Sequence, residues 1–377
     1  FYLHMDIFFL YHTLLQNLVL NYFYLTLIYF LLNPKLCINA SLNGAKLFFS
    51  SVFPTMFPFM VICNLIIALD GIKMYSKVLG PLICKPLNLN YQCSFAIIAS
   101  FLCGYPLGAK YSTNLYKENL ISKDEFARLL NIASNIGPLF LIGTVGTSML
   151  GSTKLGYLLL IPSYLSCFII GILLKNKKKR PLTSSFNNAI KNTVKAKNIG
   201  EIIKDSISDA ALNALILCGY VTIFSVVISM LQEIIFSDKL IFNLCQKFNI
   251  PFDIISGILL GSIEATNGCN IISSSNLDIS LKLCLISFLC SFGGLSIIAQ
   301  TTSFFYKENI SIPKYFFTKL LQGIISFAIM FSIFSFFKQS ISTFSSGTIV
   351  YLYITPLITF ILINLLIAII YKLISTS

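Results

Sequence analysis

Charged residues and tryptophan are scarce in this sequence of 377 residues: 11% are Asp, Glu, Lys or Arg, and none is Trp. Soluble globular domains carry about 25% charged residues and roughly 45–50% apolar ones. Here 56% of the residues are hydrophobic, and the mean hydropathy is +0.83. One water-soluble core cannot bury so much apolar surface. The composition excludes a cytosolic enzyme and predicts an all-α protein that crosses the membrane several times.

The groups that most enzyme and metal sites need are also scarce. Only two histidines occur, His4 and His12, and none of the eleven cysteines belongs to a CxxC pair. A structural zinc site needs clustered Cys or His ligands, and the sequence contains no nucleophile elbow, Walker loop or dinucleotide fingerprint. We therefore expect no catalytic residue, no metal, no cofactor and no ATP-driven step in this chain.

The net charge of +13 predicts orientation in the membrane rather than nucleic-acid binding. Lys and Arg concentrate on cytoplasmic loops, and the run Lys175–Pro181 is the most basic in the chain. Placing this run inside puts both termini in the cytoplasm. About eight spanning helices are expected, the first of them a retained anchor: 7–32, 50–69, 132–150, 156–174, 208–236, 282–303, 315–337 and 348–371.

Two parts of the chain, 40–174 and 200–337, share a pattern of spans and glycine breaks. Gly137-Pro138 in the first aligns with Gly293-Gly294 in the second. Because each part has an odd number of spans, the second starts from the opposite side, and an inverted repeat is expected. Chance similarity between apolar segments is the alternative. The remaining predicted segments are an N-terminal anchor (1–39), a basic cytoplasmic linker (175–199) and a C-terminal spanning helix (338–377).

Two glycine-rich segments are too interrupted to be ordinary spans. Ser94–Ser112 and Ile254–Ser275 each contain Gly and polar residues halfway, so their apolar arms are too short to cross a bilayer. Irregular backbone at membrane depth requires cover by protein or a water-filled cavity. We interpret the segments as re-entrant hairpins from opposite sides, an arrangement typical of a transporter's central site. The alternative is that their glycines only permit close helix packing.

Three blocks of the sequence are similar to a known family: GYPLGAK at 104–110, NLISKDEFARLLNIASNIGPLFLIGTVG at 119–146, and GSIEATNG at 261–268. Over about residues 40 to 335 they resemble the YlbJ-type sporulation integral membrane proteins of the gate-domain, or nucleoside-recognition, group. This resemblance implies a spore-forming bacterium and a role in forming the spore cortex. It also implies a distant likeness to the cores of concentrative nucleoside transporters, which does not fix a substrate.

Candidate substrate-binding groups lie at the breaks of the two hairpins. Glu264 is a carboxylate inside an apolar stretch, and charges at membrane depth are costly and usually functional. A hairpin tip in water is the alternative. Thr266 and Asn267 follow within one turn. Tyr105 and Lys110 occupy the matching break, where Lys110 is expected to pair with Glu264, to bind an anion, or to extend its ammonium to the interface.

Polar residues beside the two helix breaks complete the candidate set. Asn135 precedes Gly137-Pro138, Gln300 follows Gly293-Gly294, and Thr144 is the residue that matches Gln300. Side chains of this kind bind a solute in some proteins and only bond to neighbouring helices in others. The sequence supports both interpretations equally.

These features favour a secondary transporter or permease for a small polar solute in the cell membrane. The resemblance implies that this membrane is one that surrounds the forespore. Its partners would be lipids and the solute, with H⁺ or Na⁺ coupling through Glu264 as an option and no nucleic acid. Assembly into a homo-oligomer is left open. The alternative is a scaffold that positions cortex-building proteins. A transporter requires a polar cavity lined by the hairpins, whereas a scaffold would fill that space with apolar side chains.

Overall fold

The computed structural model describes residues 24, 26–69, 80–175, 198–236, 243, 245–247 and 250–342. The predicted span 348–371 lies outside these residues, as do most of the predicted anchor 7–32 and most of the linker 175–199. Every element within the described part is helical. Residues 26–32 and 80–87 are helical. The labelled elements are, in chain order, α2 (Pro34–Leu47), η1 (Phe48–Val52), α3 (Phe53–Ala68), α5 (Cys93–Cys103), α6 (Leu107–Lys117), α7 (Lys123–Ile132), η2 (Phe140–Met149), α8 (Thr153–Leu173), α9 (Ile199–Phe236), α11 (Phe252–Ile263), α12 (Ala265–Ser274), α13 (Ile279–Phe292), α14 (Gly294–Thr302), η3 (Tyr306–Glu308) and α15 (Ile312–Ser342).

Four stretches of helix in the described part are long and apolar enough to cross a membrane: Thr153–Leu173, Ile199–Glu233, Ile279–Thr302 and Ile312–Ser335. A fifth candidate is the pair Pro34–Val52 and Met56–Ile62, which is bent by 58°. The protein is therefore an all-α polytopic membrane protein, as the composition predicts.

The predicted span 132–150 is not one continuous helix. α7 ends at Ile132, residues 133–137 are irregular, and helical structure resumes at Pro138 and continues as η2. Proline disfavours helical backbone in the residue before it and cannot donate a helix hydrogen bond. Gly137-Pro138 therefore accounts for a full break here, whereas the later span is interrupted only briefly between α13 and α14, where Gly293 and Gly294 both have positive φ.

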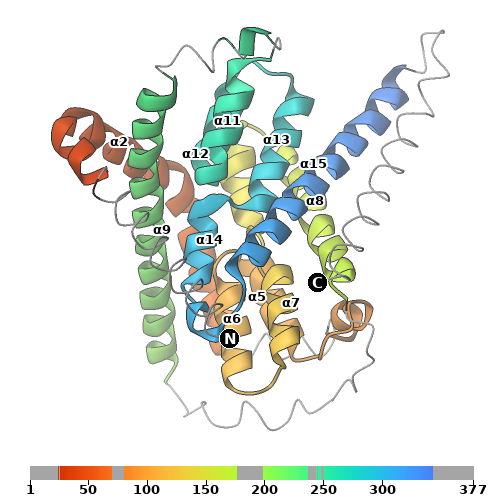
Figure 1. Ribbon diagram of the computed structural model, residues 1–377. Coiled ribbons are helices and arrows are strands. Elements are labelled where there is room, and N and C mark those ends of the chain that lie inside the picture. Colours follow the sequence, from red (N-terminus) through yellow and green to blue (C-terminus); the bar gives the residue numbers. More distant parts are fainter. Residues whose placement is uncertain are drawn as a thin grey trace, which may run out of the picture.

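The two glycine-rich segments form helical hairpins that approach each other from opposite ends of the molecule (Figure 1). Helices α5 and α6 pack together as hairpin 1, and α11 and α12 pack together as hairpin 2. Their arms contain 10 to 12 residues, which gives lengths of about 15–18 Å, roughly half of a bilayer's hydrocarbon core. Re-entrance into the membrane stays a prediction that these lengths fit, and the inverted repeat stays a prediction.

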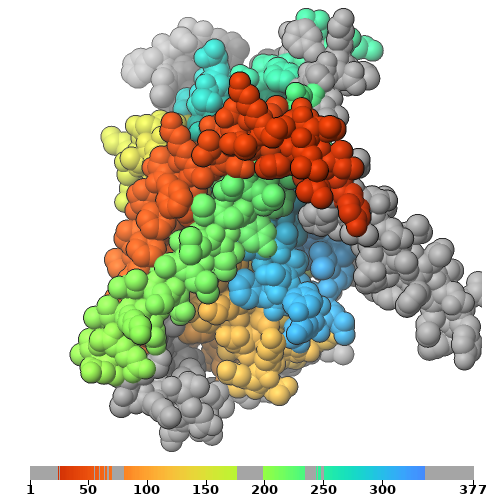
Figure 2. Space-filling view, turned by 90° about the vertical axis from the view of Figure 1, so that its left-hand side faces the viewer, coloured from red at the N-terminus to blue at the C-terminus, as the bar shows by residue number. Residues whose placement is uncertain are grey.

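Apolar packing holds the hairpins against the longer helices. Hairpin 1 and α7 share one cluster with α8 and α15, built on buried residues such as Phe126 and Leu130. Hairpin 2 shares a second cluster with α13, η2 and α3, in which Leu289 is fully buried. On the outside, α2 crosses over α9 (Figure 2). A Cβ on Gly44 of α2 would lie 2.6 Å from the Ser225 hydroxyl of α9, so only glycine fits at this crossing.

Candidate functional site

The tip of hairpin 1 packs directly on the irregular break at 133–137. Helix α5 ends at Gly104, whose φ of +76° suits glycine. A Cβ there would overlap the backbone nitrogen of Gly137, and a Cβ on Gly108 would overlap the carbonyl oxygen of Ala133. The glycines of the GYPLGAK block thus allow the backbone of hairpin 1 to contact the backbone of the break at 133–137.

The tip of hairpin 2 packs in the same way on the break between α13 and α14. Glu264 interrupts the hairpin with extended backbone (φ −141°). The two arms of the hairpin meet at Gly261 and Gly268, where a Cβ on Gly268 would lie 2.2 Å from the Gly261 Cα and a Cβ on Gly261 would lie 3.0 Å from the Gly268 Cα. Gly294, at φ +77°, lies beside this tip, since a Cβ on it would be 3.0 Å from the Gly261 carbonyl oxygen.

Tyr105, at the tip of hairpin 1, also contacts the break on which hairpin 2 packs. Its hydroxyl donates a long hydrogen bond, 3.5 Å, to the Ser291 carbonyl, and lies 3.5 Å from the position that a Cβ on Gly293 would take. Residues 291–294 therefore contact hairpin 1 on one side and hairpin 2 on the other. The convergence of both hairpins and both breaks is the geometry that paired interruptions predict.

Glu264 is buried, with 2% of its surface exposed, and caps the second arm of its own hairpin. One carboxylate oxygen accepts from the Thr266 amide nitrogen at 3.0 Å. The other accepts from Asn267, from its amide nitrogen at 2.7 Å and from its Nδ2 at 2.9 Å. A negative charge at a helix N-terminus is favoured by these donors and by the helix dipole. Asn267 Nδ2 also donates to the Ser225 hydroxyl at 3.0 Å, which ties the cap to α9.

Lys110 does not take part in this arrangement. Its side chain is half-buried on α6, and within the described residues no ion pair or hydrogen bond joins it to Glu264. Of the three options for this lysine, pairing with Glu264 is not formed in this structure. Anion binding and an interfacial ammonium remain.

A second buried polar cluster centres on Lys319 of α15. Its Nζ donates to the Ser134 carbonyl at 2.6 Å and to Gln322 Oε1 at 2.7 Å, and lies 5.1 Å above the centre of the Tyr105 ring. Gln322 Nε2 in turn donates to Asn135 Oδ1 at 3.0 Å. Lys319 and Gln322 are each 1% exposed. Sequence reasoning missed both residues, although a lone lysine inside an apolar span is itself a signal of function.

Three buried hydroxyls lie beside this cluster. Those of Ser134, Thr301 and Tyr315 are close to one another but form no hydrogen bond of good geometry with any described residue. Buried polar groups usually have partners. These hydroxyls can therefore bind a water molecule or a polar group of a solute.

The sequence-predicted site residues separate into two groups, with Lys110, Thr144 and Gln300 outside both. Tyr105 and Asn135 belong to the Lys319 cluster, whereas Thr266 and Asn267 belong to the Glu264 cap. The Thr144 hydroxyl donates to the Ser51 carbonyl at 3.1 Å and thereby links η2 to η1. Gln300 is buried on α14, with 3% of its surface exposed. Within the described residues no group of three His, Cys, Asp or Glu could hold a metal ion.

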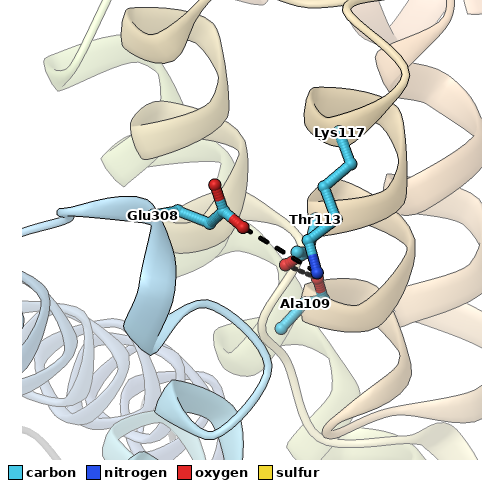
Figure 3. A network of polar contacts seen from close by, with 4 residues as sticks. All are labelled: Ala109, Thr113, Lys117 and Glu308. Carbon is cyan, nitrogen blue, oxygen red and sulfur yellow. Dashed lines mark hydrogen bonds and ion pairs between the residues drawn. The ribbon is translucent and has the colours of Figure 1, made fainter.

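An ion pair lies at the outer end of hairpin 1 (Figure 3). Lys117, near the end of α6, lies 3.8 Å from the carboxylate of Glu308 in η3. One turn earlier, the Thr113 hydroxyl donates to the Ala109 carbonyl at 2.8 Å. The lysine side chain is 56% exposed, so the pair is screened by water and contributes little stability.

Comparison with known proteins finds sequence matches to this chain. The gate family, described as nucleoside recognition, matches residues 49–175, a range that includes hairpin 1 and the break at 133–137. The sporulation integral membrane protein YlbJ of Bacillus subtilis (strain 168) is 25% identical over 310 residues, covering 78% of this chain and 76% of that protein. No solved structure matches. These matches confirm the resemblance predicted from the sequence: the chain is similar to the YlbJ-type sporulation integral membrane proteins and carries a gate, or nucleoside-recognition, segment.

Proposed function

We propose that this protein is a secondary transporter of a small polar solute, acts in a membrane around the forespore and is needed to form the spore cortex. The observation that carries the proposal is that both hairpin tips contact the second helix break at residues 291–294, while the tip of hairpin 1 also packs on the break at 133–137. Buried polar groups lie on both sides. The match to a sporulation membrane protein supports the location in a membrane around the forespore. The match to a nucleoside-recognition segment supports a small polar solute.

Each hairpin has its own polar group to expose if it moves. Displacing hairpin 1 would open the surroundings of Lys319 and Asn135, while displacing hairpin 2 would open those of Glu264 and Asn267. Because the hairpins come from opposite ends of the molecule (Figure 1), alternate displacement would give access first from one side and then from the other. We place both termini in the cytoplasm, following the distribution of basic residues.

One observation favours a scaffold instead. Glu264 and Lys319 already have partners within the protein, and the hairpin tips are closed. An open pocket of about 820 Å³ lies elsewhere, between α2 and α9, and polar side chains such as Asn39, Asn43 and Gln232 line it. A scaffold would use that outer surface to hold a partner protein and would leave the hairpins shut.

A ligand screen on the purified protein separates the two functions. We expect one class among nucleosides, peptidoglycan precursors and small carboxylates to raise the melting temperature by several degrees, since a ligand at 100 times its Kd stabilises by about 2.7 kcal/mol. Asn135→Ala should abolish this shift, whereas Asn39→Ala, in the outer pocket, should retain it. A shift lost only in Asn39→Ala, or no shift with any class, would contradict the transporter.

A further inference from the structure

Lys319 is a buried cation whose described surroundings contain no carboxylate. The titratable groups around it and Tyr105 are Tyr315 on α15, Cys167 on α8 and Cys290 on α13. Its positive charge is met by two neutral oxygen acceptors and by the face of the Tyr105 ring. An ammonium without a counter-charge is costly to bury, so each of these contacts affects whether the proton stays on the amine.

The three contacts differ in what they require of the amine. A neutral lysine amine still has two N–H groups, which match the two oxygen acceptors, the Ser134 carbonyl and Gln322 Oε1. Attraction to the face of an aromatic ring requires the positive charge. Loss of one proton would therefore keep both hydrogen bonds and remove only the contact to Tyr105.

Tyr105 is the side chain at the tip of hairpin 1. The preceding residue, Gly104, packs on the break at Gly137, and the Tyr105 hydroxyl donates to the Ser291 carbonyl at the other break. A contact that depends on charge at Tyr105 thus acts on the place where hairpin 1 meets both helix breaks.

We propose that Lys319 is the proton-coupling group of this protein, and that its proton holds the tip of hairpin 1 closed through Tyr105. The inference rests on the proposed transport function, in which the hairpins open and close. Coupling is reciprocal: a proton that favours the docked tip is bound more tightly while the tip is docked. Raising the pH removes the proton and loosens the tip, and lowering the pH restores it.

Glu264, the coupling residue expected from the sequence, is less suited to this role. Its carboxylate receives three N–H donors from its own helix α12, so its charge is stabilised whatever hairpin 1 does. Lys319 instead contacts hairpin 1 and the break at 133–137 from the separate helix α15. A group that joins separate elements can couple a proton to their relative motion.

Hydrogen exchange of the full chain in lipid nanodiscs tests the proposal without any solute. The measured quantity is the exchange rate of residues 100–110 divided by that of residues 254–263, after correction for the intrinsic rate. This ratio should rise about tenfold as the pH is raised, because loss of a desolvated cation–π contact changes the population of the open hairpin by about that factor. Lys319→Gln keeps two N–H donors but has no charge, so its exchange should be high and independent of pH. Lys314→Gln, which removes an exposed lysine on the same helix, should behave as wild type.

Two variants of Tyr105 test the contact between Lys319 and the Tyr105 ring by changing the ring instead of the lysine. They serve in place of Lys319→Gln if that variant fails to fold. Tyr105→Phe keeps the ring and should keep the pH response, whereas Tyr105→Leu should lose it. A wild-type hairpin without a pH response, or a response that persists in Lys319→Gln or Tyr105→Leu, would overturn the proposal. The transport function is judged separately by the ligand screen, so either idea can fail alone.

Discussion

Gly108→Ala should abolish almost all folded protein in the membrane. The added Cβ would overlap the Ala133 carbonyl oxygen and lie 2.7 Å from Ser100 Cβ. The first of these atoms belongs to the backbone of the break at 133–137, which cannot move aside as a flexible side chain can. Overpacking of this kind typically costs about 1–3 kcal/mol even where side chains can adjust, so the cost here should exceed that range. The amount of monodisperse protein in mild detergent measures it.

Gly219→Ala is the matched control for that variant. Gly219 lies in the middle of α9, and a Cβ on it would meet no atom within 4 Å. Alanine favours helix over glycine by about 1 kcal/mol, so this variant should be as stable as wild type or slightly more stable. Normal yields of Gly108→Ala would show that hairpin 1 does not pack on the break as described.

Glu264→Gln should leave the protein in the membrane but give spores with a defective cortex and poor heat resistance. Glutamine keeps the size of the side chain, but its NH2 group replaces one of the two carboxylate oxygens and cannot accept from the N–H of Thr266 or of Asn267 that this oxygen serves. Losing one hydrogen bond to a charged group costs about 1.5–3 kcal/mol, which lowers the melting temperature without unfolding a well-packed protein. Membrane abundance and the frequency of heat-resistant spores are the two measurements.

The control is Glu308→Gln, which removes the partly exposed carboxylate that pairs with Lys117. Exposed ion pairs contribute about 0–1 kcal/mol, so both abundance and spore resistance should match wild type. Heat-resistant spores at wild-type frequency from Glu264→Gln would end the idea that this carboxylate serves transport. Loss of that variant from the membrane would instead favour a purely structural cap.

The hairpins were predictable because their signal is local. Glycine and polar residues in the middle of Ser94–Ser112 and Ile254–Ser275 interrupt an apolar stretch, and the structure breaks the helices there, at Gly104 and Glu264. The burial of Glu264 follows from the same reasoning, since the residue lies between two apolar arms. Its role as a cap for α12 depends on the Thr266 and Asn267 amides, whose direction is fixed only once the helix forms.

The Lys319 cluster could not be assembled from the sequence, because its partners come from distant parts of the chain. Ser134 and Tyr105 lie about two hundred residues before it and meet it only because the break at 133–137 and the tip of hairpin 1 both lie against α15. A single lysine such as Lys319 also changes the average hydropathy of an apolar span very little. The same averaging missed α2, Pro34–Leu47, whose lysines and asparagines lower its hydropathy. It also placed the start of α9 at 208 rather than at Ile199, where the helix begins outside the apolar stretch.

Cysteine accessibility at the ends of the two hairpins tests the central geometry most directly. Single cysteines replace Asn90 and Asn119 on either side of hairpin 1, and Ile250 and Asn276 on either side of hairpin 2, with the parent chain as background. Because the hairpins approach from opposite ends of the molecule (Figure 1), both positions beside hairpin 1 should react with an impermeant reagent only from the cytoplasmic side. Both positions beside hairpin 2 should react only from the other side. Labelling of the two ends of one hairpin from opposite faces would show that it crosses the membrane, and the two tips could not then meet as gates at residues 291–294.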